Sequence, residues 1–428
     1  MDQLDPGLQS MIKRRQELIG PSIKLFYRKP VEFVRAEGVT LYDSHGNEYL
    51  DAYNNVPSVG HCHPRVVEAV AKQMSTLNTN TRYLTDTVLD YSERLLATHP
   101  AQLDKVMYAC SGSEANDLAL RIARYATGNE AVIVTANAYH GLTASISELS
   151  PSLGRNVPLG PNTFLIPAPA CQAGGDVTAA GRAFRASVEQ AIADIERRGK
   201  RLAAILVDTL FSSDGLAPDP AGFLAAMVDV VHQAGGLVIA DEVQAGFARS
   251  GDEMWGYQRH GFIPDLVTMG KPMGNGLPIS AVVAQGTHLE KFGRDIRYFN
   301  TGAGNSACLA AAGAVLDIIE EEGLQENCLK VGAVMLAGMT DLAARYPIMT
   351  EVRGAGLFLA ADIVNPATGQ QDAKLADAVV AGLRDRRILV SATGPAENVL
   401  KVRPPLVFTA NHAEHFLSEL DQVLATIG

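Results

Sequence analysis

Residues 236–277 of the chain read GLVIADEVQAGFARSGDEMWGYQRHGFIPDLVTMGKPMGNGL. The run Leu237–Ala240 is short, apolar and rich in β-branched residues, so it is predicted to be a buried strand that ends at Asp241. Leu266–Met269 is a second run of this kind, and Lys271 stands just beyond its end. Because ligands of open α/β sheets bind at the carboxyl ends of the strands, Asp241 and Lys271 are predicted to lie at a functional site.

The setting of Lys271 suits a chemical role. Pro272, Gly274 and Gly276 follow it in a loop, whereas solvating lysines more often lie on helix faces. A partly desolvated lysine can lose its proton and form a Schiff base with an aldehyde. Pyridoxal phosphate (PLP) is the cofactor that uses such a lysine, and it needs an acid against its pyridine nitrogen. Asp241 is the candidate for that acid, and an ordinary loop lysine is the alternative interpretation of Lys271.

A cluster of small residues follows the predicted strand Val106–Ala109. Ser111, Gly112 and Ser113 precede a run with apolar residues at helical spacing, so they are expected at the start of a helix. Glycine lets the backbone approach a ligand closely, the hydroxyls donate hydrogen bonds, and the first helical N–H groups carry positive partial charge. The motif is therefore predicted to form a phosphate cup, although helix capping alone would explain Ser113 followed by Glu114.

The run AVIVTANAYHG at residues 131–141 predicts another buried strand, with Tyr139 and His140 near its end. A flat aromatic ring at this place could stack on the pyridine face of PLP. The alternative is an aromatic residue that simply packs at the end of a strand.

Seven segments occur in a defined order along the chain: NNVPSVGHCHPRVVEAV, SGSEANDLALRIAR, Tyr139-His140-Gly141, IADEVQAGFARSG, TMGKPMGNGLP, FNTGAGN and VRGAGLF. Together they resemble the class III (ω-type) aminotransferase family of PLP enzymes. The resemblance implies an α/β protein of PLP-dependent transferase fold type I. This fold would consist of a large domain, with a mostly parallel seven-stranded sheet between helices, and a smaller α+β lobe from both termini. The expected division is 1–62 (N-terminal segment joining the small lobe), 63–322 (large PLP-binding domain) and 323–428 (C-terminal small domain).

The resemblance also implies roles for single residues. Lys271 would hold the PLP aldehyde and act as a general base, and Asp241 would stabilise the pyridinium. Thr301 would reach the cofactor phosphate of a neighbouring subunit, which predicts a homodimer. Asp208 and Phe211 depart from the glutamate and glutamine that are common in the family, so no substrate contact is carried over to them. The implied cofactor-binding residues are Ser111, Gly112, Ser113, Tyr139, His140, Asp241, Val243, Gln244, Lys271 and Thr301.

Four residues are expected at the substrate end of the pocket. Asn55 belongs to a segment that the family places near the active site, and Arg82 lies in a polar linker that could cross to a neighbouring active site. Lys401 stands where many class III aminotransferases have an arginine that pairs with the substrate carboxylate, and Arg403 follows it closely. The alternatives are a surface or interface role for Arg82 and a solvated strand face for Lys401 and Arg403.

The lysine at position 401, with NNVPSVGHCHP, LNTNTRYL and GKPMGNG, resembles the ethanolamine-phosphate phospho-lyase branch more than the alanine–glyoxylate branch. The predicted function is β-elimination of phosphate from O-phosphoethanolamine or a similar amino-alcohol phosphate. The alternative is an ω-amine:pyruvate (or glyoxylate) aminotransferase. The complete catalytic set disfavours a protein that only binds PLP. A P-loop or Rossmann nucleotide binder is disfavoured because GxxxxGK[ST], or GxGxxG in the right context, is missing.

Composition narrows the class of protein further. A chain of 428 residues is too long for one ordinary core, so two packed lobes are expected. A formal net charge of −11 argues against nucleic acid or an anionic membrane as a partner. The N-terminus lacks the apolar core of a secretion signal, so a cytoplasmic location is predicted. The five scattered cysteines are predicted to be reduced thiols, and His61-Cys62-His63 is expected to pack rather than to bind a metal.

Hydrophobic spacing predicts the remaining secondary structure. Residues 151–185 are rich in proline and glycine and are predicted to be a long surface excursion. Helices are predicted at 65–77, 184–198, 224–233, 307–321, 328–346 and 372–386, and C-terminal strands at 351–363, 388–393 and 399–408.

Overall fold

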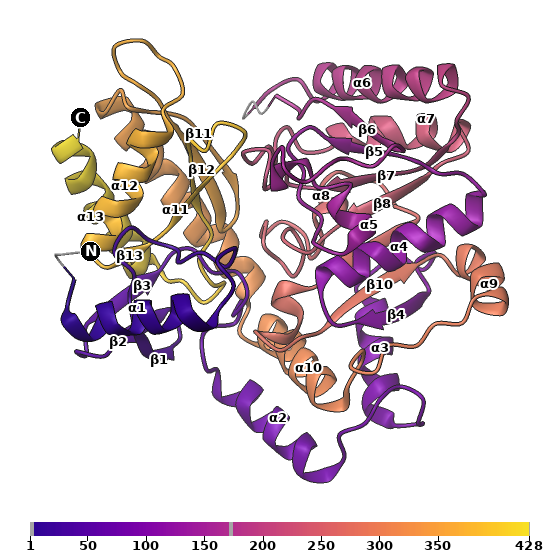
Figure 1. The fold of residues 1–428 in the computed structure, drawn as a ribbon, viewed down its shortest axis with the longest axis horizontal. Helices are drawn as coiled ribbons and strands as arrows, with labels where there is room; N and C mark the ends of the chain where they lie inside the picture. Colours follow the sequence, from indigo (N-terminus) through magenta and orange to yellow (C-terminus); the bar gives the residue numbers. More distant parts are fainter. Residues whose placement is uncertain (1–3, 171–173, 428) are drawn as a thin grey trace.

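A seven-stranded sheet forms the centre of the computed structural model, which describes residues 4–170 and 174–427 (Figure 1). The strand order is β4-β10-β9-β8-β7-β5-β6. Only β10 runs antiparallel to its two neighbours, so the predicted α/β fold with a mostly parallel seven-stranded sheet is confirmed. The strands are β4 (Lys105–Ala109), β5 (Ala131–Thr135), β6 (Thr163–Ile166), β7 (Leu202–Asp208), β8 (Leu237–Asp241), β9 (Leu266–Met269) and β10 (Ser280–Ala284).

Both faces of this sheet are buried, which explains why its strands are continuous apolar runs. In β5, Ala131 and Ile133 pack into one core cluster, whereas Val132 and Val134 pack into another. Helix α4 contributes its apolar face to the second cluster, and α6, α7 and α10 contribute to the first. These helices are α4 (Gly112–Thr127), α6 (Val177–Arg197), α7 (Val228–Gln233) and α10 (Ser306–Glu321).

Two four-stranded sheets form a smaller part of the molecule beside the large sheet (Figure 1). In one of them, β13 pairs in parallel with β3, so both ends of the chain contribute to one small lobe, as predicted. The division at residues 62 and 322 remains a prediction. The first sheet contains β1 (Phe33–Glu37), β2 (Thr40–Asp43), β3 (Glu48–Asp51) and β13 (Ile388–Leu389), and the second contains β11 (Met349–Ala355), β12 (Phe358–Ile363), β15 (Val399–Val402) and β14 (Ser391–Thr393).

The other helices complete the two parts. Predicted helices 65–77, 307–321 and 372–386 match α2, α10 and α12 within one residue at each end, and α11 starts four residues before the predicted 328. In the described part of the chain, no helix is both long and apolar enough to cross a membrane. The remaining helices are α1 (Pro6–Leu18), α2 (Pro64–Thr76), α3 (Asp86–Ala97), α5 (Ala144–Ser147), η1 (Pro151–Leu153), α8 (Gly256–Arg259), η3 (Lys271–Gly274), α9 (Gly286–Asp295), α11 (Leu324–Arg345), α12 (Ala373–Asp385) and α13 (Ala410–Ile427).

The predicted surface excursion at 151–185 is partly wrong. It contains β6, an edge strand of the large sheet, and α6 begins at Val177 rather than at residue 184. The helix starts there because the side chain of Asp176 caps it, accepting hydrogen bonds from the N–H groups of Thr178 and Ala179. Residues 171–173 of the predicted excursion lie outside the described residues.

Two further predictions needed correction, one because a turn divides the element and the other because the type of helix changes within it. The predicted strand 351–363 is a hairpin of β11 and β12, and Gly356 makes the turn with a φ of +53°. The predicted helix 224–233 is a short 3₁₀ helix, η2 (Phe223–Met227), which continues into α7.

Candidate active site

Asp241 and Lys271 come from neighbouring strands of the large sheet. β8 and β9 pair in parallel, with Asp241 opposite Thr268, and Lys271 opens η3 just after β9 ends. Both side chains line one pocket with a volume of about 90 Å³. The carboxyl ends of the two predicted strands therefore do form one cavity. Its lining residues are Gly112, Ser113, Asn116, Tyr139, His140, Gly141, Asp208, Asp241, Val243, Gln244 and Lys271.

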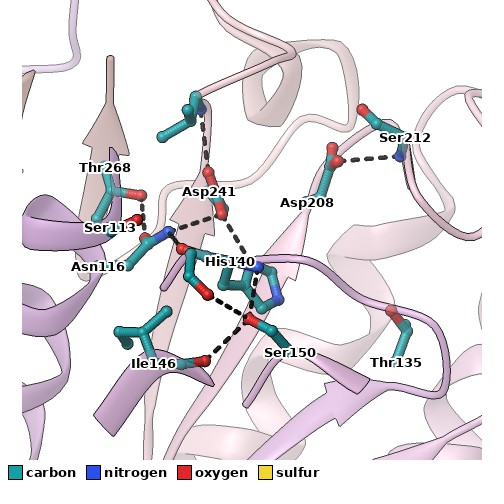
Figure 2. Close-up of polar contacts among 12 residues, drawn as sticks. Ser113, Asn116, Thr135, His140, Ile146, Ser150, Asp208, Ser212, Asp241 and Thr268 are labelled. Atoms are coloured by element: carbon teal, nitrogen blue, oxygen red, sulfur yellow. Dashed lines mark hydrogen bonds and ion pairs between the residues drawn. The ribbon is translucent and has the colours of Figure 1, made fainter. Parts of the chain in front are cut away.

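Asp241 is held in place by three neighbours (Figure 2). Its Oδ2 accepts a hydrogen bond from Asn116 Nδ2 at 2.9 Å and lies 2.7 Å from His140 Nδ1. Its Oδ1 accepts one from the Val243 N–H at 3.0 Å. The residue is only 4% exposed, so these contacts fix the direction of a buried carboxylate.

The neighbours of Asp241 are themselves fixed by buried hydrogen bonds (Figure 2). Asn116 Nδ2 also donates to the His140 carbonyl oxygen at 2.8 Å, and Asn116 Oδ1 accepts from Thr268 Oγ1 at 2.6 Å. The His140 N–H donates to Ser150 Oγ at 3.0 Å. Residues from α4, β9 and the segment after β5 thus support one carboxylate.

Lys271 is surrounded by protein in a way that favours its neutral amine. Burial lowers its pKa to about 8, and the positive charge of Arg403 acts in the same direction, whereas Asp241 and Asp208 oppose the shift. With this pKa, roughly a tenth of the amine is unprotonated at pH 7. A neutral amine of this kind can react with an aldehyde or accept a proton.

The first turn of α4 forms another wall of the pocket. The side chain of Ser111 caps the helix by accepting from the Glu114 N–H, and Gly112 and Ser113 supply the first helical N–H groups, which have no acceptor within the helix. A Cβ at Gly112 would lie only 2.8 Å from a Val243 methyl carbon, so any side chain would fill this space. The free N–H groups and the helix dipole favour a phosphate here.

Two cations are buried beside this pocket. Lys401 and Arg403 are 7% and 5% exposed, which excludes a solvated strand face. Lys401 Nζ donates to Gln244 Oε1 at 3.5 Å and to the Ser212 carbonyl oxygen at 3.3 Å, and Arg403 Nη1 donates to the same Gln244 oxygen. Burial lowers the pKa of both groups, that of Lys401 well below its usual value. Because Gln244 also lines the pocket of Lys271, the cations lie at its edge.

A family model described as Aminotransferase class-III matches residues 27–424. The chain belongs to the class III aminotransferase family.

Individual relatives match almost the whole chain. The "Ethanolamine-phosphate phospho-lyase homolog 1" of Caenorhabditis elegans is 38% identical, and the alignment covers 97% of this chain and 93% of that protein. The "Alanine--glyoxylate aminotransferase 2-like" protein of Drosophila melanogaster is 39% identical, and the alignment covers 97% of this chain and 87% of that protein. One solved structure is described as a phospholyase from Arthrobacter in complex with phosphoethanolamine. It is 43% identical in sequence, the match covers 97% of this chain and 99% of that chain, and the TM-score is 0.93.

Membership of the class III aminotransferase family indicates PLP as the cofactor and a PLP-dependent lyase or transaminase as the activity. The pocket offers a matching group for each part of PLP. The N-terminus of α4 suits its phosphate, Asp241 suits its ring nitrogen, and Lys271 suits its aldehyde.

The other residues expected from the class III resemblance divide into two groups. Asn55 is fully buried, and its Nδ2 donates to the Gln244 carbonyl oxygen at 3.3 Å, so it lies next to the pocket. Arg82 and Thr301 are exposed and do not line the pocket of Lys271 in the same chain. The guanidinium of Arg82 instead lies 3.7 Å from the ring centre of Phe299, two residues before Thr301.

Two polar residues of the pocket were not assigned a role from the sequence. Asn116 lies on the otherwise apolar buried face of α4. A polar amide at a helical position where apolar residues are expected is the sequence signal for its role. Asp208 pairs with Asp241 in the β7–β8 register, and burial together with the charge of Asp241 raises its pKa. Its carboxylate accepts from the N–H groups of Leu210 and Ser212, so Asp208 also shapes the loop beside Lys401.

The two histidines of the His61-Cys62-His63 segment make polar contacts within the protein, including one between His63 Nε2 and Glu322 Oε1 at 3.3 Å. His61 Nε2 lies 2.7 Å from Asp51 Oδ2, and His63 Nδ1 accepts from the Arg65 N–H at the start of α2. Within residues 4–170 and 174–427, no group of three His, Cys, Asp or Glu side chains could hold a metal ion. The described cysteines are free thiols (Cys62, Cys110, Cys308 and Cys328), and Cys171 lies outside the described residues.

Proposed function

We propose that this class III family member is a phospho-lyase that eliminates phosphate from O-phosphoethanolamine or a similar amino-alcohol phosphate. The observation that carries the proposal is the buried pair of cations, Lys401 and Arg403, which shares Gln244 with the pocket of Lys271. In the described part of the chain, their hydrogen-bond partners are carbonyl and amide oxygens, and neither cation forms an ion pair with a carboxylate. Two such cations favour a phosphate dianion over a neutral amine.

The similarity to the Arthrobacter phospholyase supports this proposal. That protein was solved with phosphoethanolamine bound, and it shares 43% of its residues with this chain over nearly the full length of both. The Caenorhabditis elegans relative carries the same activity in its name. Lys401 and Arg403 are the candidates for holding the phosphate because both are buried and both donate to Gln244.

The proposed mechanism assigns one task to each group. When bound, PLP supplies an electron sink for the carbon next to the substrate amine. Asp241, oriented by Asn116 and His140, holds negative charge against the ring nitrogen. Lys271 takes the proton from that carbon at its Nζ, because a pKa of about 8 leaves part of the amine neutral. Arg403 holds the phosphate while the neighbouring carbon–oxygen bond breaks.

A class III aminotransferase of small amines is the second candidate. The observation that favours it is the 39% identity to the alanine–glyoxylate aminotransferase 2-like protein over 97% of this chain. In that case the same cations would bind the carboxylate of a keto acid. Lys271 would give back the proton that it took, and no phosphate would be eliminated.

We also propose that the chain works as a homodimer in which Thr301 and Arg82 reach the active site of the second copy. Both residues are exposed and do not line the pocket of their own chain. The same segments carry exposed large apolar side chains: Leu77, Tyr83, Leu84 and Phe299 are 46%, 65%, 95% and 40% exposed. An apolar surface of this kind is typical of a protein–protein contact.

The cytoplasm is the proposed location. Four free thiols in the described residues are compatible with a reducing compartment. Retention of activity in the soluble cytoplasmic fraction of the source cells would support this proposal, whereas recovery of the protein in a secreted fraction would contradict it.

The decisive experiment mixes purified, PLP-loaded protein with O-phosphoethanolamine in the absence of any keto acid. We expect steady release of phosphate and acetaldehyde over many turnovers, and we expect Lys271→Ala to abolish it. If neither product forms, the lyase proposal fails. Formation of alanine from pyruvate and a simple amine would then identify the aminotransferase.

A further inference from the structure

The side chain of Lys401 has unusual surroundings for a lysine. It is 7% exposed, and its Nζ has two long hydrogen bonds, at 3.3 Å to the Ser212 carbonyl oxygen and at 3.5 Å to Gln244 Oε1. Both acceptors are neutral, and the Phe358 ring lies 5.3 Å from Nζ. Within the described residues Lys401 has no carboxylate partner that would hold it permanently in the ammonium form.

Arg403 differs from Lys401 in how firmly it keeps its proton, although both side chains donate to the same amide oxygen of Gln244. Arg403 Nη1 donates to Gln244 Oε1, and its Nε donates to the Tyr53 carbonyl oxygen at 3.4 Å. A guanidinium stays protonated in proteins, whereas a buried lysine exchanges its proton readily. The pair therefore combines one permanent charge with one group that can give up a proton.

The proposed elimination creates a need for such a proton. When the carbon–oxygen bond of a phosphate ester dianion breaks, the electron pair moves to the bridging oxygen. Without a proton the leaving group would be the trianion, which is strongly basic and leaves slowly. A positioned acid that protonates this oxygen during bond breaking accelerates the step.

We infer that Lys401 is the general acid that protonates the departing phosphate. The inference rests on the proposed phospho-lyase function and deepens it. Lys271 takes the proton from the carbon next to the amine, a carbon–carbon double bond forms, and the carbon–oxygen bond breaks. Lys401 Nζ gives its proton to the released oxygen, so hydrogen phosphate leaves. Water then converts the two-carbon fragment into acetaldehyde and ammonia, and Lys401 regains a proton as Lys271 loses the one it took.

The electrostatics of the site agree with this assignment. Burial lowers the pKa of Lys401 well below its usual value, and the charges of Arg403 and Lys271 add to the effect, whereas Asp208 opposes it. A phosphate dianion placed between the two cations favours the ammonium form. Lys401 should therefore take up a proton when phosphate binds and release it when the ester bond breaks.

Lys401→Arg tests the inference, because arginine keeps the positive charge but does not donate its proton at neutral pH. We expect kcat for phosphate release from O-phosphoethanolamine to fall by about 10²-fold or more, with KM changed by less than about threefold. Ethanolamine O-sulfate provides the control substrate, because sulfate leaves without being protonated. Its elimination by Lys401→Arg should stay within about threefold of the parent protein.

Arg403→Lys is the matched control variant. It replaces the forked, permanent cation by a point charge, so it should raise KM for both substrates and leave the ratio of their kcat values unchanged. Equal losses of kcat on phosphate and sulfate substrates in Lys401→Arg, or no loss on either, would overturn the assignment of Lys401. Failure of the unaltered protein to release phosphate would instead overturn the proposed function.

Proton uptake on binding provides a readout that does not depend on turnover. Calorimetric titration of inorganic phosphate into the PLP-loaded protein at pH 8, in two buffers with different ionisation enthalpies, measures the protons taken up. We expect a larger proton uptake in the parent protein than in Lys401→Arg. The same uptake in both proteins would contradict the inference even if the kinetic result agreed with it.

Discussion

The cost of burying Lys271 can be measured as a change in protein stability. Its pKa falls from 10.5 to about 8 in the folded protein, mainly because of burial and then because of the charge of Arg403. Since one pKa unit corresponds to about 1.36 kcal/mol, the protein without cofactor loses about 3 kcal/mol of unfolding free energy at pH 7. Lys271→Met, which keeps an unbranched side chain one atom shorter and removes the amine, should recover this amount.

The sign of the pH dependence follows from proton binding. Between about pH 8 and 10.5 the unfolded chain still holds the lysine proton that the folded protein has released. The stability of the parent protein relative to Lys271→Met should therefore rise with pH across this window. The advantage of the variant should shrink from about 3 kcal/mol at pH 7 to less than about 0.5 kcal/mol at pH 10.5.

Urea titration without cofactor measures this difference. Trp255 is the only tryptophan of the chain and is fully buried, so its fluorescence reports unfolding. Lys13→Met is the matched control, because Lys13 is exposed on α1 and its replacement should change stability by less than about 0.5 kcal/mol. Equal stabilities of parent and Lys271→Met at pH 7, or a difference that does not depend on pH, would refute the reasoning.

Three other changes have expected outcomes. Asn116→Leu leaves a buried carbonyl and a buried hydroxyl without their partner, so it should lower the unfolding free energy in urea by about 3 kcal/mol or more; a loss below about 1 kcal/mol would contradict this. Gly112→Ala places a methyl group 2.8 Å from Val243 and should weaken PLP affinity at least about tenfold in a fluorescence titration, with recovery when Val243→Ala is added. Arg82→Ala should raise KM for O-phosphoethanolamine far more than for phenylethylamine, and equal increases would make Arg82 a structural residue.

The catalytic pair was predictable because each residue sits next to a strong local signal. Leu237–Ala240 and Leu266–Met269 are apolar runs whose lengths suit buried strands, and they became β8 and β9 with the expected ends. Parallel strands share one carboxyl edge, so Asp241 and Lys271 had to come together once both strands joined the same sheet. Here local sequence pattern and a general rule of sheet architecture were sufficient.

The supporting contacts were not predictable by this route. Asn116 and Thr268 interact through side chains that are 152 residues apart in the chain, and neither has a local pattern that points to the other. The burial of Lys401 and Arg403 could not be predicted either, because strand periodicity does not reveal which face of β15 meets Gln244. Such contacts depend on how distant elements pack, and only the three-dimensional structure shows it.

Errors in the predicted secondary structure came from single residues that start or interrupt an element. Asp176 begins α6 seven residues before apolar spacing becomes regular, since its cap satisfies the first N–H groups without help from the core. Gly356 divides one apolar run into two strands, and a turn of this kind leaves the hydrophobic pattern nearly continuous. Apolar periodicity locates the elements better than it locates their ends.

The catalytic residues and the cations belong to different sheets. Asp241 and Lys271 stand at the ends of β8 and β9 in the large sheet, whereas Lys401 and Arg403 belong to β15 of a four-stranded sheet and the residue after it. Protein engineers could exploit this separation. A library confined to residues 399–403 would vary the recognised leaving group while Asp241 keeps its hydrogen bonds to Asn116, His140 and Val243. New substrates could then be selected without disturbing the contacts that orient Asp241.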